Sequence, residues 1–198
     1  MTAPTRPTTQ HVGLHTHIDS LGFHLERQEY AEAINHFERS TSADPSFDDG
    51  WQNLGAVYLK LDQPEIAIGH YRTALQIRPD AESHYSMAMG LKALGHSNEA
   101  MEHFRQSLRL NPAYSRAWNA LGVVLASAER LEEAFECFKR AIRIDPWYAQ
   151  AYFNLGAAYE VGGDLNRAVH YYGKALRVDR NFDQAQQNLD RLQLRGSP

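Results

Sequence analysis

The stretch WQNLGAVYLKLDQPEIAIGHYRTALQIRP, residues 51–79, contains one full copy of a pattern that recurs along this 198-residue chain. Prolines mark the period, with spacings of 34, 33 and 34 residues between Pro45, Pro79, Pro112 and Pro146. A fixed period of this length indicates a repeat architecture, in which each unit packs on its neighbours. The pattern positions in the quoted copy are Trp51, Leu54, Gly55, Tyr58, Ala67, Tyr71, Ala74 and Pro79.

The other four copies follow the pattern to different degrees. The third is looser, because His84 replaces the tryptophan and Ser107 the last alanine. The first keeps Ala33, Phe37 and Pro45, but its earlier pattern positions hold His17, Ser20, Leu21 and His24. The fourth and fifth are regular: Trp118, Leu121, Gly122, Leu125, Ala134, Phe138 and Ala141, then Tyr152, Leu155, Gly156, Tyr159, Ala168, Tyr172 and Ala175.

Each copy is expected to form two helices joined by a turn. In residues 51–58 the large apolar and small positions are spaced as one face of a helix, and residues 67–74 carry the facing stripe of a second helix. Turn-forming residues separate the two stripes, and the prolines fall where one repeat ends and the next begins. These turns include Asp62-Gln63-Pro64, Gly95-His96-Ser97 and Gly162-Gly163-Asp164.

The chain resembles the tetratricopeptide repeat family, since residues 51–79 match the family pattern at every position. The resemblance implies an all-α fold, a right-handed superhelical solenoid of five helix-turn-helix repeats plus a C-terminal capping helix, and a shared role in binding other proteins. We expect a disordered tail over 1–10 and a single domain over 11–195. The expected repeats are 14–47, 48–80, 81–114, 115–148 and 149–181, with the capping helix at 182–195.

Composition argues against several other classes of protein. A net charge of −4 without a basic stripe disfavours nucleic-acid binding, and no segment is apolar enough for a membrane span. We find no motif of an enzyme active site, and predict no catalytic residue and no cofactor. The single cysteine, Cys137, fits a packing position in a reducing compartment. With no signal-peptide pattern at the start, we expect a cytoplasmic protein.

Candidate partner-binding residues lie on the first helix of each repeat. The resemblance implies that exposed positions of these helices line a concave groove. Chaperone-binding members of the family carry converging basic residues that bind the C-terminal carboxylate of the chaperone. In this chain Glu82 and Ser86 occupy the positions of those basic residues, so we do not expect binding of a chaperone C-terminus. The groove candidates are Asp19, Asn53, Tyr85, Met89, Lys92, Arg116, Asn119, Phe153, Asn154 and Asn188.

One groove position is a small polar residue in most copies. Some family members use asparagines there to hold the backbone of an extended peptide, and an amide can both donate to and accept from a peptide group. The alternative is that these are ordinary solvated side chains. Tyr85 and Phe153 equally fit either an exposed contact or packing between helices. The position reads Asp19, Asn53, Ser86, Ala120, Asn154 and Asn188 along the chain.

Histidines are concentrated near the start of the chain. His11, His15 and Asp19 have a helical spacing that could bind zinc, but His17 and His24 would project to another face. We therefore expect a polar first repeat and assign no metal ligand. The leading functional hypothesis is a non-catalytic scaffold or assembly factor that binds a partner peptide or helix in the groove. The alternative is a self-associating module, linked by metal through the histidine-rich first helix.

Overall fold

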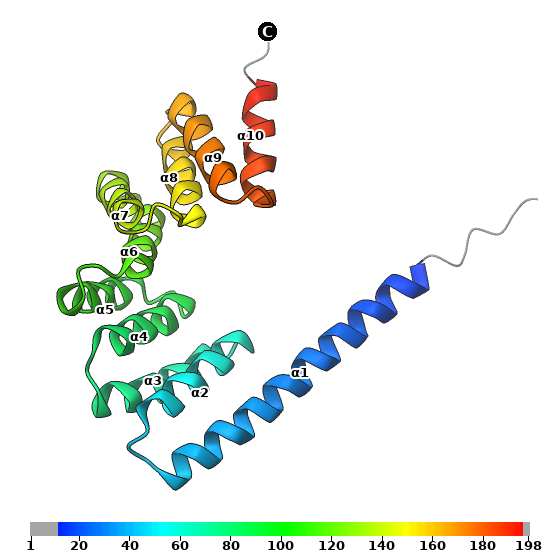
Figure 1. Cartoon of the computed structure of the whole chain (residues 1–198), viewed down its shortest axis with the longest axis vertical. Helices are drawn as coiled ribbons and strands as arrows, with labels where there is room; N and C mark the ends of the chain where they lie inside the picture. Colours follow the sequence, from blue (N-terminus) through cyan, green and yellow to red (C-terminus); the bar gives the residue numbers. More distant parts are fainter. Residues whose placement is uncertain (1–11, 196–198) are drawn as a thin grey trace, which may run out of the picture.

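The protein is described by a computed structural model that gives the backbone of residues 12–195 and the side chains of residues 28–194. The expected tail over 1–10 lies outside these residues. The described part is all-helical, without a strand (Figure 1). Its helices are α1 (Val12–Ala43), α2 (Asp48–Lys60), α3 (Pro64–Ile77), α4 (Ala81–Ala93), α5 (Ser97–Leu110), α6 (Ser115–Ser127), α7 (Leu131–Ile144), α8 (Ala149–Val161), α9 (Leu165–Val178) and α10 (Asp183–Arg195).

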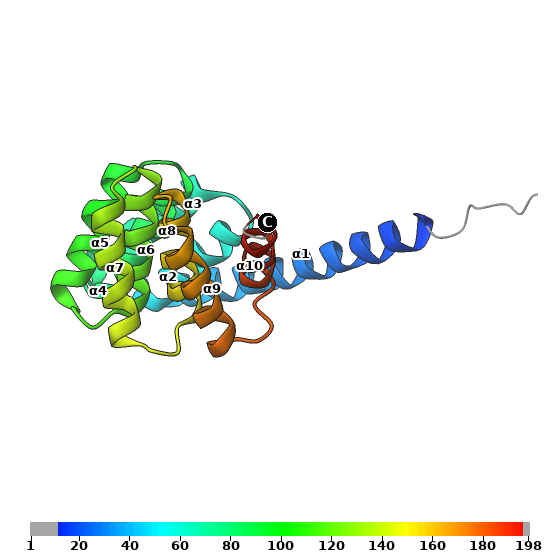
Figure 2. The ribbon, with the colours of Figure 1, turned by 90° about the horizontal axis from the view of Figure 1, so that it is seen from above.

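From α2 onward, consecutive helices pack in pairs, and the pairs stack into a curved array (Figures 1 and 2). Each pair also packs on the next, as α3 does on α4 and α5 on α6. In addition, α2 contacts α4 and α6 contacts α8, so the first helices of successive pairs lie close together and form the inner layer. The predicted all-α superhelical solenoid is confirmed.

The first copy differs from the expected helix-turn-helix, because α1 is one continuous helix of 32 residues. In the other four copies a residue with a positive φ lies in the turn between the two helices, 17 positions before the repeat proline or, in the fifth copy, before Arg180. These residues are Asp62 (57°), Gly95 (78°), Glu129 (58°) and Gly163 (82°). The equivalent residue in the first copy, Gln28, is helical. No glycine favours a turn there, and the polar first half of this copy lacks the aromatic and small residues that pair two helices.

The two helices of a pair approach closely where an aromatic ring meets a residue with little or no side chain. A Cβ atom added to Gly122 on α6 would lie 2.7 Å from Cε1 of Phe138 on α7, and one added to Gly55 would lie 2.4 Å from Cε1 of Tyr71. Such distances are too short for van der Waals contact. Phe138 itself is buried at 1% exposure. The aromatic ring of the second helix therefore occupies the space that a side chain on the first helix would need.

His70 on α3 lies between two aromatic rings of α2. Its centroid is 5.7 Å from that of Trp51 and 5.2 Å from that of Tyr58, with the rings nearly parallel. Burial lowers the pKa of His70, and the negative charge of Glu38 partly opposes this. In the fifth copy Tyr171 holds the equivalent position and stacks on Tyr159 at 5.5 Å. The same packing site thus accepts either a histidine or a tyrosine.

The α10 helix covers the last pair at the C-terminal end of the described chain. It packs on α9 and buries Ala185 (0% exposed) and Leu192 (5% exposed). Polar residues occupy much of the rest of its surface, including Gln186 and Asp190, which are joined by a hydrogen bond of 2.8 Å. A terminal helix with one apolar face ends the apolar stack without exposing it to water.

We expect Gly122→Leu or Ala134→Leu to lower the free energy of unfolding by about 1–3 kcal/mol, because a larger side chain would force α6 and α7 apart. Gly69→Ala is the control, since a Cβ at Gly69 meets nothing within 4 Å. An added methyl in an exposed helix should be neutral or stabilising there. Urea unfolding of the three variants measures the difference. Equal stabilities would contradict the close-approach interpretation.

We expect the stability of the wild type to depend more steeply on pH than that of His70→Tyr. Because the folded state lowers the pKa of His70, the unfolded chain binds a proton more readily below about pH 6.5. The contribution of the neutral, half-buried His70 to the free energy of unfolding is therefore present above that pH, and it is lost as the pH falls through the folded-state pKa of His70. The other histidines are common to both proteins, so the difference between urea-unfolding curves at pH 7.5 and pH 5 reports His70. Parallel pH profiles would refute the assignment.

Candidate functional site

The inner layer of first helices presents a concave face, which we define as the exposed surface of α2, α4, α6 and α8. Polar side chains on this face form hydrogen bonds from one repeat to the next. Between α2 and α4, Gln52 donates from Nε2 to the hydroxyl of Ser83 and accepts from the hydroxyl of Ser86, each at 3.4 Å. Both bonds are long, and they link side chains of two neighbouring repeats.

Between α4 and α6, one arginine is held by two tyrosines and a glutamate. The guanidinium of Arg116 lies 5.4 Å from the ring centroids of both Tyr85 and Tyr114, and donates to the Tyr114 hydroxyl at 2.9 Å. The same hydroxyl donates to the carboxylate of Glu82, which also pairs with Arg116 at 3.5 Å. Burial, reinforced by this carboxylate, raises the pKa of Tyr114. Arg116 is therefore held by three neighbouring side chains, while 57% of its own side chain is exposed.

Between α6 and α8, a chain of amides crosses the concave face. Asn154 donates from Nδ2 to Oδ1 of Asn119 at 2.8 Å and accepts from Nε2 of Gln150 at 3.0 Å. Asn119, which is 7% exposed, donates in turn to the hydroxyl of Tyr148 at 3.3 Å. A buried amide needs such partners, because an unpaired polar group away from water is costly. This network joins two repeats.

An apolar pocket of about 290 Å³ lies next to the amide network. Val161, at the end of α8, stands at its rim with 75% of its surface exposed. Asn154 also contributes to the lining, so one wall of the pocket is polar. An exposed apolar site beside fixed hydrogen-bonding groups can hold an apolar side chain and orient the chain that carries it. The residues that line the pocket are Val123, Ala126, Ser127, Leu131, Phe138, Asn154, Ala157, Ala158 and Val161.

The predicted small polar positions differ in their exposure and in their hydrogen bonds. Asn53 is exposed, and its side chain makes no hydrogen bond among the described residues. Asn154 is half-buried and bonded on both sides, whereas Ala120 is buried and interrupts the row. Asn188 is half-buried on α10. Asp19 lies in α1, outside the residues whose side chains are described.

The predicted apolar candidates are built into the contacts between helices. Tyr85 packs on Tyr114, with ring centroids 5.0 Å apart, and Phe153 packs on Phe182 at 5.1 Å. Met89 is half-buried against the core, and Lys92 is half-buried near the end of α4. These residues therefore shape the concave face, but only part of each side chain is exposed on it.

Two tyrosines of the site were not among the sequence candidates. Tyr114 and Tyr148 each lie two residues after a repeat proline, directly before α6 and α8. Their ring hydroxyls reach the first helices and bond to Glu82 and Asn119. The available signal was the aromatic residue that recurs two positions after the proline, as Phe47, Tyr114 and Tyr148, and is absent after Pro79.

No group of three or more side chains suited to holding a metal occurs among the described residues. The strip of His11, His15 and Asp19 is not tested by this, because His11 lies before the described residues and the other two side chains fall outside them. Cys137 is buried at 6% exposure, and burial raises the pKa of its thiol to about 11. A thiol in that environment is protonated at neutral pH and unreactive.

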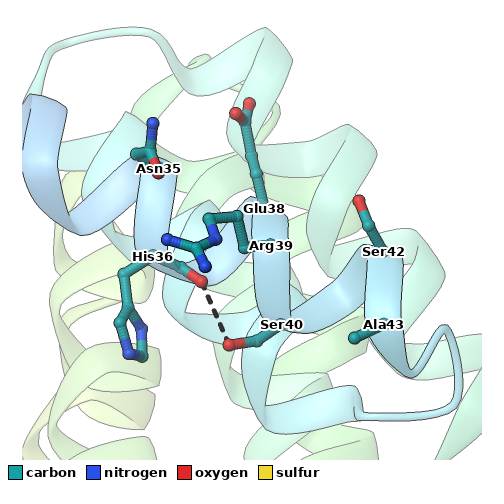
Figure 3. Close-up of a pocket in the computed structure, with 7 residues that line it drawn as sticks. All are labelled: Asn35, His36, Glu38, Arg39, Ser40, Ser42 and Ala43. Carbon is teal, nitrogen blue, oxygen red and sulfur yellow. Dashed lines mark hydrogen bonds between the residues drawn. The ribbon is translucent and has the colours of Figure 1, made fainter.

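A surface hollow near the C-terminal end of α1 has a polar lining (Figure 3). The described residues that line it all belong to α1, and the Ser40 hydroxyl donates to the His36 carbonyl oxygen at 3.0 Å. A ligand site needs groups that converge from more than one side, so we assign no site here. The residues are Asn35, His36, Glu38, Arg39, Ser40, Ser42 and Ala43.

Within residues 12–195, none of the helices combines the length and apolar character needed to span a bilayer.

Comparison with known families supports the repeat assignment over most of the solenoid. Models described as "Tetratricopeptide repeat" match residues 49–80, 81–114 and 149–182, and a model described as "TPR repeat" matches residues 125–161. The chain belongs to the tetratricopeptide repeat (TPR) family. The matched segments cover α2–α5, the end of α6 and α7–α9, while α1 and most of α6 lie outside them.

The curated relatives of this TPR protein are much longer than the region they share with it. Protein FlbA of Caulobacter vibrioides is 29% identical over 122 residues, which is 60% of this chain and 20% of FlbA. Human tetratricopeptide repeat protein 6 is 27% identical over 100 residues, 50% of this chain and 19% of that protein. The chain thus matches about a fifth of each relative.

Several solved TPR structures share the fold. MamA superposes with a TM-score of 0.67 at 26% identity, covering 80% of this chain and 93% of MamA. PilF of Pseudomonas aeruginosa gives 0.72 at 27% identity over 77% and 69% of the two chains. YrrB, described as a TPR protein with an unusual peptide-binding site, gives 0.64 at 22% identity over 81% and 83%.

We expect Asn154→Ala to lower the free energy of unfolding by about 1–3 kcal/mol, because it leaves the carbonyl of buried Asn119 without its donor. Asn53→Ala is the matched control and should change stability by less than about 0.5 kcal/mol, since that side chain is exposed and unbonded. Urea unfolding gives both values. If both variants were as stable as the wild type, Asn154 would have no role in joining the repeats.

Proposed function

We propose that this TPR protein is a non-catalytic scaffold or assembly factor that holds a peptide segment or helix of a partner protein on its concave face. The observation that carries the proposal is the pocket between α6 and α8, where an apolar depression adjoins the fixed amide of Asn154. Side chains already held by bonds between repeats lose little entropy when a partner binds.

The chemistry of the face fits a peptide with one apolar anchor. An aliphatic side chain would enter the pocket at Val161, and the adjacent backbone would pass Asn154, whose amide retains a second N–H and a second lone pair. Arg116, held beside Tyr85 and Tyr114, offers a fixed positive charge one repeat away. Fixed polar groups around an apolar pocket provide orientation and specificity.

Relatives of this protein support the general role. Two of them are by name components of assemblies, Superkiller complex protein 3 of mouse and anaphase-promoting complex subunit 7 of Arabidopsis thaliana. YrrB, which shares the fold, is described as having a peptide-binding site. The family's common use as a protein-binding superhelix agrees with this role.

A second candidate function is self-association, favoured by the shape of α1. Figure 1 shows the backbone of α1 extending well beyond the stacked helices toward its N-terminal end. Size-exclusion chromatography with and without a chelator separates the candidates. A strict monomer indifferent to metal would exclude the second one.

The experiment selects peptides from a phage-displayed random library on the immobilised protein and measures their affinities by calorimetry. We expect selected peptides to share an apolar anchor and to lose at least about tenfold in affinity with Val161→Asp, because a carboxylate at the rim would be desolvated by the anchor. Ile66→Asp on α3, in the outer layer, is the control; Ile66 is 45% exposed. It should leave the affinity unchanged.

A combined variant tests the polar part of the face. Asn53, Tyr85 and Asn154 changed together to Ala should abolish binding of the selected peptides, and circular dichroism must show that the variant is still folded. Peptides that tolerate Val161→Asp but are lost with Ile66→Asp would place the binding surface on the outer layer and overturn the proposal.

A further inference from the structure

Two histidines face each other across the third repeat. His84 lies on α4 and His103 on α5, and their Nδ1 atoms are 3.1 Å apart. The ring centroids are separated by 5.2 Å and the planes are tilted by 38°. Both side chains are half-buried, so one side of the pair is accessible to solvent. Two antiparallel helices joined by a short turn thus hold two imidazole nitrogens in a fixed relation.

The equivalent position in the second repeat shows what this site holds elsewhere. There Trp51 and His70 stack face to face, with ring planes only 24° apart. In the third repeat a second histidine replaces the tryptophan, and nitrogens approach each other instead of ring faces. The histidine at position 84 buries less apolar area than a tryptophan would, but it places a second potential metal ligand beside His103. Packing alone does not explain it.

The separation of the two nitrogens fits a shared metal ion. With metal–nitrogen bonds of about 2.0–2.1 Å, two imidazoles on one ion lie about 2.9 Å apart in square-planar and about 3.4 Å apart in tetrahedral geometry. The observed 3.1 Å lies between these values. We propose that His84 and His103 form a bidentate site for a divalent late transition-metal ion, namely Zn²⁺, Ni²⁺ or Cu²⁺.

Acidic side chains lie near both imidazoles. Burial is the main cause that lowers the pKa of His84 and of His103; Asp80 partly opposes it at His84, and Glu102 and Glu99 at His103. Each of these carboxylates also has a basic partner: Asp80 pairs with Arg78 at 2.8 Å, Glu99 with His96 at 3.2 Å and Glu102 with Arg109 at 3.0 Å. Within the described residues no group of three or more metal-binding side chains occurs. The remaining coordination positions of an ion bound to the pair would therefore be open to water. Imidazole is a ligand that these metals share, whereas Mg²⁺ and Ca²⁺ prefer oxygen.

A bound ion would tie α4 to α5 within the copy that fits the repeat pattern least well, besides the first. Ser107 of this copy is a second departure, and its hydroxyl donates to the Ala81 carbonyl oxygen at 2.7 Å. Metal binding adds stability because the unfolded chain does not hold the two histidines together. This site is separate from the concave face and does not depend on the proposed partner.

The test compares the wild type with His84→Trp, which recreates the Trp51–His70 pair of the second repeat and should fold. Zinc chloride is titrated into each protein by calorimetry, and melting is followed by circular dichroism with zinc or with chelator. At zinc concentrations 100-fold above Kd, we expect the Tm of the wild type to rise by about 5–10 °C. His84→Trp should lose this rise and bind one ion fewer per chain.

The other histidines contribute equally to both proteins, so only the difference counts. His103→Gln serves as a second variant, because glutamine retains hydrogen bonding but is not an imidazole ligand. Equal ion counts and equal Tm rises in the wild type and both variants would overturn the proposal and leave the pair as a hydrogen bond alone.

Discussion

The contact between an aromatic ring and a residue with almost no side chain sets the distance at which two helices pair. Phe138 against Gly122 shows it most plainly, since even one methyl group at the glycine would clash with the ring. The contact recurs with Tyr71 on Gly55, and both rings are buried, with Phe138 at 1% and Tyr71 at 3% exposure. Where the first copy lacks it, no pair forms and α1 runs straight.

The turns show which part of the fold local sequence could predict. Gly95 and Gly163 mark turns because glycine adopts a positive φ without steric cost. Glu129 adopts the same conformation although its residue type does not favour it, because the packing of α6 on α7 requires a turn there. The continuous first helix was the harder case. Its periodic residues Ala33 and Phe37 fit the pattern, while the missing aromatic and small residues in the first half of this copy were the deciding feature.

The concave face was predictable in outline but not in its bonds. Asn53 and Asn154 occupy equivalent positions, yet one is exposed and unbonded while the other is fixed between two amides. That difference depends on Asn119, which accepts from Asn154 and donates to the hydroxyl of Tyr148, directly before α8. Hydrogen bonds between repeats depend on side chains some 30 residues apart, and a pattern within one repeat does not contain them.

Alternate helices of the solenoid contact each other along its inner layer, which affects how the solenoid can bend. Direct contact between alternate helices occurs along the inner layer, as between α6 and α8, and the polar bonds follow the same line. The inner layer of the solenoid should therefore be stiffer than its outer layer. Bending would separate or close the outer helices with little change along the inner layer. A molecule seated across α6 and α8 would hold that edge and fix the angle between these two repeats.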